Sequence, residues 1–283
     1  MQANEDFKKL GKRFWANVRT ISEAIGYTDR KTKNVRVYSF EDMIDAITKV
    51  DLAYTHIWKN DKPTELGKNL RRYFEFRAQV INNYVEPRLM DATRARKTFE
   101  RLNEQLKPSS PIPMNKQRGK KKKPAYLTAI VNMIIENNIG DFDCDYDPKR
   151  LTTITRNNEP LRTLARRVDG CFPSCTNPIA IWEIKEYYHT TTFGSRVADG
   201  VYESLLDGLE LEELRQNEKI HVQHLFIVDA HYTWWGMGKS YLCRMIDMIH
   251  MGYVDEVLFG YEVVERLPEI VKDWVKQLEM REK

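Results

Sequence analysis

Hydrophobic residues in the first part of the chain recur at intervals of three and four, a spacing that places them on one face of a helix. The helices predicted in this way cover residues 5–24, 40–50 and 64–105. Ser39 is a suitable N-cap for the second helix, and Pro87 is expected to interrupt the third. Residues 35–38 alternate as in a short strand. Residues 1–110 are therefore predicted to form a mainly helical region.

The pattern changes at residues 111–124, which contain almost no apolar residues. Three prolines and a run of four lysines, Lys120, Lys121, Lys122 and Lys123, fall within this stretch. Such a composition is typical of a linker or an exposed loop. The lysines form either a phosphate-binding arm or a solvated, mobile loop, and the sequence leaves both open.

Residues 125–283 alternate between the helical period and short apolar runs typical of strands. Helices are predicted over residues 125–138, 196–215, 239–251 and 264–280, and strands over about 150–156, 161–169, 179–188, 220–230 and 255–263. This order indicates an α/β domain with a mixed central sheet. The predicted organisation is thus a helical region (1–110), a basic linker or loop (111–124) and an α/β domain (125–283).

Charge is unevenly distributed between the two halves of the chain. Residues 1–140 hold 28 Lys and Arg against 16 Asp and Glu, a balance of +12, whereas residues 141–283 hold 17 against 25, a balance of −8. A basic half suits a polyanion and an acidic half suits metal ions, although solvated helices also carry such charge. No apolar run is long enough to span a bilayer, and no signal peptide is evident. With four scattered cysteines, the expected compartment is the cytosol.

The predicted strand at 179–188 combines a buried pattern with two charges. Ile181, Glu183 and Lys185 share one face, and Trp182 and Ile184 share the other. Apolar residues on both faces are typical of a central strand. A charge buried there is costly unless it is paired or binds a metal ion.

A second carboxylate, Asp169, precedes the segment 170–177, which is rich in Gly, Pro, Ser and Asn. This segment can turn the chain back and bring Asp169 close to Glu183. Two carboxylates with open water positions suit Mg²⁺, which lowers the pKa of a bound water and polarises a phosphodiester oxygen. Lys185 is placed to orient that water and offset developing charge.

The combination of Asp169 with Glu183-Ile184-Lys185 on an apolar strand resembles the PD-(D/E)XK nuclease superfamily, which includes many type II restriction endonucleases. The resemblance covers about residues 125–263 and implies an αβββαβ core. It implies that Asp169, Glu183 and the Ile184 carbonyl bind Mg²⁺, with Mn²⁺ able to replace it, and that Lys185 is catalytic. A carboxylate from the preceding helix often joins them, and Glu136 is the best match. The proline that usually precedes the first Asp is Val168 here.

The resemblance further implies a site-specific double-stranded DNA endonuclease that acts as a homodimer. The helical region would supply much of the DNA grip, together with Lys120–Lys123, Arg196 and Lys239. Arg196 ends a polar stretch that is equally consistent with a plain connecting loop. The alternatives are another nuclease of this superfamily (repair, phage-defence or structure-specific) and a DNA-binding protein with an inactive nuclease core.

Three weaker signals point to other ligands. Residues 236–240 imitate a phosphate-binding loop, but Thr233 stands where Gly is required, so no nucleotide cofactor is expected. Residues 141–146 begin like a calcium loop, but Tyr146 replaces its essential Gly. Cys171 and Cys175 lack a second Cys or His pair at zinc-finger spacing, and unliganded thiols are expected.

Overall fold

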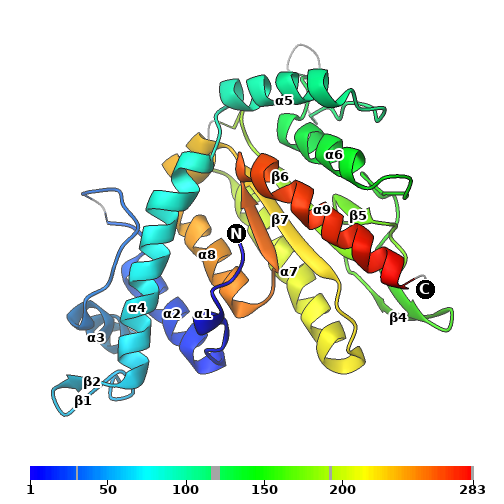
Figure 1. Cartoon of the computed structure of the whole chain (residues 1–283). Coiled ribbons are helices and arrows are strands. Elements are labelled where there is room, and N and C mark those ends of the chain that lie inside the picture. The colour runs from blue at the N-terminus through cyan, green and yellow to red at the C-terminus, as the bar shows by residue number, and fades with distance from the viewer. Residues whose placement is uncertain (30, 116–121, 191–192, 282–283) are drawn as a thin grey trace.

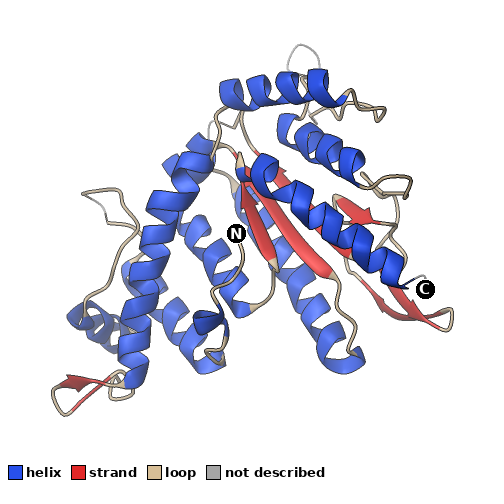
Figure 2. Cartoon of the chain, viewed as in Figure 1, coloured by secondary structure: helices blue, strands red, loops and turns tan. Residues whose placement is uncertain are grey.

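The computed structural model describes residues 1–283 except 30, 116–121, 191–192 and 282–283. A four-stranded sheet lies at the centre, with helices on both of its faces (Figures 1 and 2). Its strands, in spatial order, are β5 (Gly170–Phe172), β6 (Ala180–Glu186), β7 (Gln223–Asp229) and β8 (Glu256–Phe259). β5 runs antiparallel to β6, whereas β6, β7 and β8 are parallel. The predicted α/β class with a mixed central sheet is confirmed.

The sheet is buried on both sides because its strands carry apolar residues at successive positions. In β6, Ala180, Trp182 and Ile184 belong to the core beneath α6 and α9, and Ile181 belongs to the core beneath α7. The four helices of this half are α6 (Tyr126–Asn138), α7 (Ser195–Glu218), α8 (Lys239–Met251) and α9 (Glu262–Arg281). α7 and α8 cover the face opposite to α6 and α9 (Figure 1). Glu183 and Lys185 alternate with Ile184 and therefore face α7.

The N-terminal half is mainly helical, as predicted. Its elements are α1 (Glu5–Lys8), α2 (Lys12–Ile25), α3 (Phe40–Lys49), the short strands β1 (Trp58–Lys59) and β2 (Lys62–Pro63), α4 (Glu65–Val80) and α5 (Ala92–Leu106). Ser39 caps α3 in a capping box with Asp42, so the predicted N-cap is confirmed. Helices α1 to α4 share one aromatic core and dock on α8, where Tyr73 and Arg77 bond to Asp247 at 2.6 and 3.1 Å.

The junction between α4 and α5 is held by main-chain hydrogen bonds. α4 continues as a π-helical turn (Ile81–Val85) and a 3-10 turn (Glu86–Arg88), so the predicted break near Pro87 is confirmed. The Met90 N–H donates to Asp229 at the end of β7, at 2.7 Å, and the Tyr261 N–H donates to the Arg88 carbonyl at 2.8 Å. The backbone between the two helices is thus fixed to the sheet. α5 itself packs on α6 (Figure 1).

Two predicted elements in the N-terminal half are wrong. The expected strand at 35–38 forms only a single bridge among the described residues, between Val35 and Thr28, because none of the described strands pairs with it. The helix expected over 5–24 is divided into α1 and α2, and Gly11 takes an extended conformation as the N-cap of α2.

The predicted strand at 161–169 is also wrong in its extent. β4 (Glu159–Thr163) pairs only with β3 (Thr153–Arg156), and the two form a separate hairpin outside the central sheet. Its tight turn uses Asn157 and Asn158, both at positive φ, which asparagine tolerates better than most residues. Residues 164–169 then leave the strand, and β5 begins only after Asp169. None of the described helices is long and apolar enough to cross a membrane.

Candidate active site

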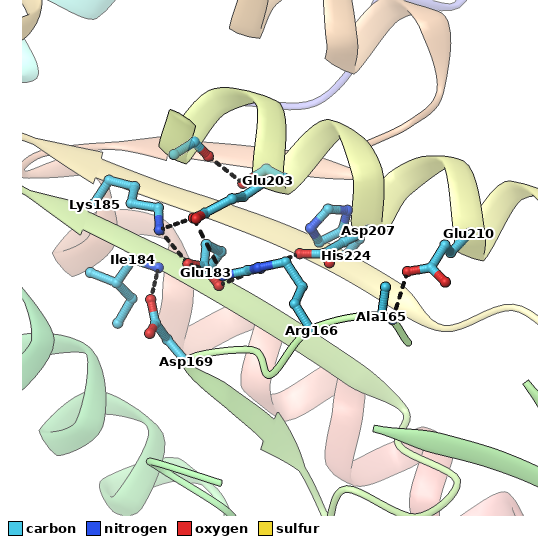
Figure 3. Close-up of polar contacts among 12 residues, drawn as sticks. Ala165, Arg166, Asp169, Glu183, Ile184, Lys185, Glu203, Asp207, Glu210 and His224 are labelled. Atoms are coloured by element: carbon cyan, nitrogen blue, oxygen red, sulfur yellow. Dashed lines mark hydrogen bonds and ion pairs between the residues drawn. The ribbon is translucent and has the colours of Figure 1, made fainter. Parts of the chain in front are cut away.

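Asp169 is placed by the β5–β6 hairpin. In that hairpin Gly170 pairs with Trp182, so residues 170–177 do return the chain as predicted. β5 is short, and Asp169 therefore lies at its open end, beside Ile184 (Figure 3). The Ile184 N–H donates to Asp169 Oδ2 at 2.8 Å. This bond fixes the carboxylate at the edge of β6.

Glu183 and Lys185 point toward α7, where further carboxylates meet them. The Lys185 ammonium donates to Glu183 Oε1 at 2.5 Å and to Glu203 Oε2 at 2.8 Å. Figure 3 shows Glu203 and Asp207 reaching from α7 toward this pair. Glu183 is only 1% exposed, so its charge depends on these partners.

Arg166 completes the cluster, although the sequence did not point to it. Its guanidinium donates to both oxygens of Glu183, at 2.8 and 3.1 Å, and to Asp207 Oδ2 at 2.6 Å. We call Arg166, Glu183, Lys185, Glu203 and Asp207 the ion-pair network. The one sequence signal for Arg166 is its place in a basic pair, three residues before Asp169, in a stretch that was expected to be a strand.

The network sets the charge state of its members. Burial opposes ionisation of Glu183, but Lys185 and Arg166 outweigh it and lower the pKa of Glu183 below its usual value. Burial also opposes the charge on Lys185, yet Glu183 and Glu203 raise the pKa of its ammonium. Burial raises the pKa of Asp207 to about 7, against the opposing effect of Arg166. Glu183 and Lys185 are therefore charged near neutral pH, and Asp207 is close to its titration midpoint.

The donors present suit a hard divalent cation. Three carboxylates, from Glu183, Glu203 and Asp207, face the two cations of the network, which leaves an acidic excess, and Asp169 adds a fourth carboxylate at the edge of β6. Asp207 Oδ1 is buried, and no group in the described part of the chain donates a hydrogen bond to it. The Ile184 carbonyl points to the same side of β6 as its N–H, and so toward Asp169. Carboxylate and carbonyl oxygens are the ligands that Mg²⁺ prefers.

A pocket of about 430 Å³ opens at this end of β6. Its lining comes from Asp169 and residues 184–190, from Ala125 and Thr128 at the start of α6, from Tyr146 and Asp147, and from residues 113–115 and Pro124. Lys185 is among the lining residues, whereas Glu183 lies behind it in the ion-pair network. Asp169 and Lys185 are therefore brought to one pocket, and Glu183 adjoins it from the α7 side.

Glu136 is not brought to this pocket. Its carboxylate accepts bonds from the Ser109 N–H and hydroxyl, at 2.7 and 2.6 Å, near the C-terminal end of α6. Glu136 is not among the residues that line the pocket, and that it joins a metal site stays a prediction. The other end of α6 faces the strand. There the Thr128 N–H donates to Glu186 Oε2 at 3.0 Å. Burial raises the pKa of Glu186 to about 7, although this bond opposes the shift.

The residues predicted to contact DNA are spread around the site. Lys120 and Lys121 lie outside the described residues, whereas Lys122 and Lys123 are exposed, next to the loop residues that line the pocket. Arg196 is exposed on the first turn of α7. Lys239 is held by the Lys33 carbonyl at 2.5 Å and lies 3.8 Å from the centre of the Trp235 ring. Whether any of them contacts DNA stays a prediction.

Two protein-family models match the chain. Residues 90–274 match the family described as a domain of unknown function (DUF7687), and residues 1–84 match a second domain of unknown function (DUF7690). The first match spans more than half of the sequence, and the chain therefore belongs to the DUF7687 family. The two matches meet within the hydrogen-bonded junction after α4. No curated protein and no solved structure matches the chain.

Proposed function

We propose that this protein is a magnesium-dependent endonuclease that hydrolyses phosphodiester bonds in double-stranded DNA at a specific sequence. The observation that carries the proposal is the pocket at the end of β6, which Asp169 and Lys185 line together. The same pocket is bordered by residues 113–115 and Pro124, on either side of the lysine run. A metal-binding carboxylate, a cation and a basic border are what a phosphodiester substrate requires.

Asp169, Glu183 and the Ile184 carbonyl would hold the metal ion. When bound, Mg²⁺ lowers the pKa of a coordinated water and polarises the scissile phosphate. The Ile184 N–H orients Asp169, and the two bonds from Arg166 orient Glu183. In the metal-free protein Arg166 therefore neutralises the carboxylate that the ion would share.

Lys185 is the group proposed to act on the reacting phosphate. Glu183 and Glu203 raise the pKa of its ammonium above the usual value, so we propose a hydrogen-bond donor rather than a general base. It instead donates hydrogen bonds that orient the attacking water and offset negative charge on the phosphate oxygens.

The DNA grip would come from the exposed cations around the pocket and on the N-terminal half. Lys122, Lys123 and Arg196 are exposed near its border or on the adjoining helix. Cutting both strands usually takes two active sites, so a symmetric homodimer is part of the proposal. Mn²⁺ is proposed to replace Mg²⁺.

A plasmid digest tests the proposal. The protein with Mg²⁺ should give discrete fragments whose sequenced ends share one motif, and chelation by EDTA should stop the reaction. Asp169→Asn should be inactive, whereas Lys276→Ala, which removes an exposed lysine paired with Asp273 on α9, should cut normally. A smear of fragments would indicate a repair, phage-defence or structure-specific nuclease. No cleavage with Mg²⁺ or Mn²⁺ would overturn the proposal.

One observation favours a second candidate, a DNA-binding protein whose nuclease core is inactive. Both oxygens of Glu183 are occupied by Arg166, and an arginine is a permanent cation that competes with a metal ion. Under that alternative the protein binds DNA in a salt-dependent manner, does not cut it, and shows no heat of Mg²⁺ binding in calorimetry.

A further inference from the structure

We propose that Asp145, Cys171 and Cys175 form a second metal site, for Zn²⁺ or an ion of similar softness. One ligand atom from each of the three residues lies within 4.8 Å of the other two. The two sulfur atoms are 3.1 Å apart, and both cysteines are fully buried. The site is separate from the Mg²⁺ ligands proposed above and goes beyond the nuclease function.

The main chain places all three side chains. Asp145 and Cys171 form a pair of main-chain hydrogen bonds, at 3.0 and 2.9 Å, so a short segment between α6 and β3 runs beside β5. The Cys175 N–H then donates to Asp145 Oδ2 at 3.0 Å. Three stretches of chain therefore converge on one point, and the convergence does not depend on flexible surface side chains.

The donor set identifies the class of ion. Thiolates select soft ions, and Zn²⁺ binds them at about 2.3 Å and carboxylate oxygens at about 2.0–2.2 Å. Two sulfurs on a tetrahedral Zn²⁺ lie about 3.8 Å apart, so the present pair needs only a small side-chain rotation to reach that spacing. Two thiolates and one carboxylate carry three negative charges. Zn²⁺ would offset two of them, and Arg150, which opposes the rise that burial causes in the pKa of the Cys175 thiol, would offset the third.

Other uses of this pair fit less well. Sulfurs 3.1 Å apart are not bonded, since a disulfide requires about 2.05 Å, and all four cysteines are free. Two ordinary buried thiols, the expectation from sequence, would bind no metal, and Asp145 would then face them only through its bond from the Cys175 N–H. The spacing rules for metal ligands could not identify Asp145, because it lies 26 residues before Cys171 and only the fold brings the two together.

The ion would act on the structure of the β5–β6 hairpin. Cys171 lies two residues after Asp169, and it pairs with Ile181, two residues before Glu183. Binding would tie β5, the loop that follows it and the segment before β3 into one unit. We infer an ion with three protein ligands and a water in the fourth position, which holds the short strand from which Asp169 extends.

Metal content of the full-length protein tests this inference. Purified from zinc-supplemented medium under reducing conditions, the protein should contain about one Zn²⁺ per chain. After growth with Co²⁺ instead, it should show a sulfur-to-cobalt charge-transfer band. Cys175→Ser and Asp145→Asn should each lose most of the bound metal. Asp145→Asn keeps an oxygen that can accept the Cys175 N–H bond, so it tests the charge without removing that contact.

Two controls keep the result specific. Cys144→Ser changes a neighbouring thiol that is not part of the cluster, and Asp169→Asn changes the proposed Mg²⁺ site; both should retain the metal. If a cysteine variant fails to fold by circular dichroism, the Co²⁺ spectrum of the wild type and the metal content of Asp145→Asn still decide. Four results would overturn the proposal. They are metal-free wild-type protein, a Co²⁺ spectrum without the sulfur band, unchanged metal content in the variants, and a Cys171–Cys175 disulfide found by mass spectrometry.

Discussion

Replacing Arg166 with methionine tests whether the ion-pair network is both a structural element and the place of a metal ion. Methionine keeps an apolar stem but removes the guanidinium, which makes two bonds to Glu183 and one to Asp207. Lys185 would then be the one remaining cation of the network, beside the carboxylates of Glu183 and Asp207. We expect the variant to unfold at a lower urea concentration than the wild type.

The magnitude follows from burial. Glu183 and Asp207 are 1% and 0% exposed, and removal of one member of a buried pair costs about 3–5 kcal/mol. Arg166 is 21% exposed, which places the expected loss near the lower limit, at about 3 kcal/mol. The pKa of Asp207 is already raised to about 7, and loss of Arg166 would raise it further. Because a protonated Asp207 no longer needs a cation, the loss should be smaller at pH 6 than at pH 8.

Mg²⁺ separates the two roles. If the ion binds at Glu183, it supplies the missing positive charge, and it should restore about 2.7 kcal/mol at 100 times its Kd. Urea unfolding with and without Mg²⁺, followed by tryptophan fluorescence, measures both effects. Arg156→Met is the matched control: its pair with Glu218 is half exposed and should contribute at most about 1 kcal/mol. A loss no greater than the control would refute the structural role, and a loss that Mg²⁺ leaves unchanged would refute the metal assignment.

Three further predictions concern catalysis, DNA binding and pH. Lys185→Ala should lower the single-turnover cleavage rate by about 10²–10³, measured where the variant is folded, since the loss of one buried partner of Glu183 also lowers stability; near-normal cleavage would contradict the proposed role. DNA affinity should fall by orders of magnitude between about 50 and 200 mM salt if some 6–10 phosphates are neutralised. An affinity that does not change with salt in a fluorescence-anisotropy titration would show that the basic surface does not bind DNA. Burial raises the pKa of Asp229 to about 7, so the wild type binds an extra proton when folded and loses stability as pH rises from about 4 to 7. Asp229→Asn should remove this loss, on the order of 4 kcal/mol, and parallel pH profiles of urea unfolding for variant and wild type would show that Asp229 is ionised in the folded protein.

Elements with a strong local pattern could be predicted from the sequence. β6 was recognised because apolar residues occupy both faces of the strand up to Trp182, and the structure places it in the middle of the sheet. The break near Pro87 and the cap at Ser39 follow from backbone chemistry, which acts within one turn of helix. The order of helices and strands after residue 125 could largely be predicted from the sequence for the same reason.

Features that depend on partners distant in the sequence could not be predicted. β5 has three residues, too few for a period, and only its pairing with β6 makes it a strand. Arg166 belongs to the site because α7 supplies Asp207, 41 residues later in the sequence. Glu136 and Glu186 show the same limit. Glu136 lies near the end of α6 and Glu186 accepts a bond from Thr128 near its start, and only the direction in which this helix crosses the sheet places Thr128 rather than Glu136 at the pocket.

The hydrogen-bonded junction after α4 makes the chain a single mechanical unit. One family match ends within it and the other begins there, yet Met90 and Arg88 are bonded to residues at or just after the ends of β7 and β8. Asp229, which receives the Met90 N–H, lies opposite Glu186 in the sheet register. The helical half and the sheet should therefore melt in one transition. A displacement of those helices should therefore shift the strand end that borders the pocket, because the Met90 N–H is bonded to Asp229.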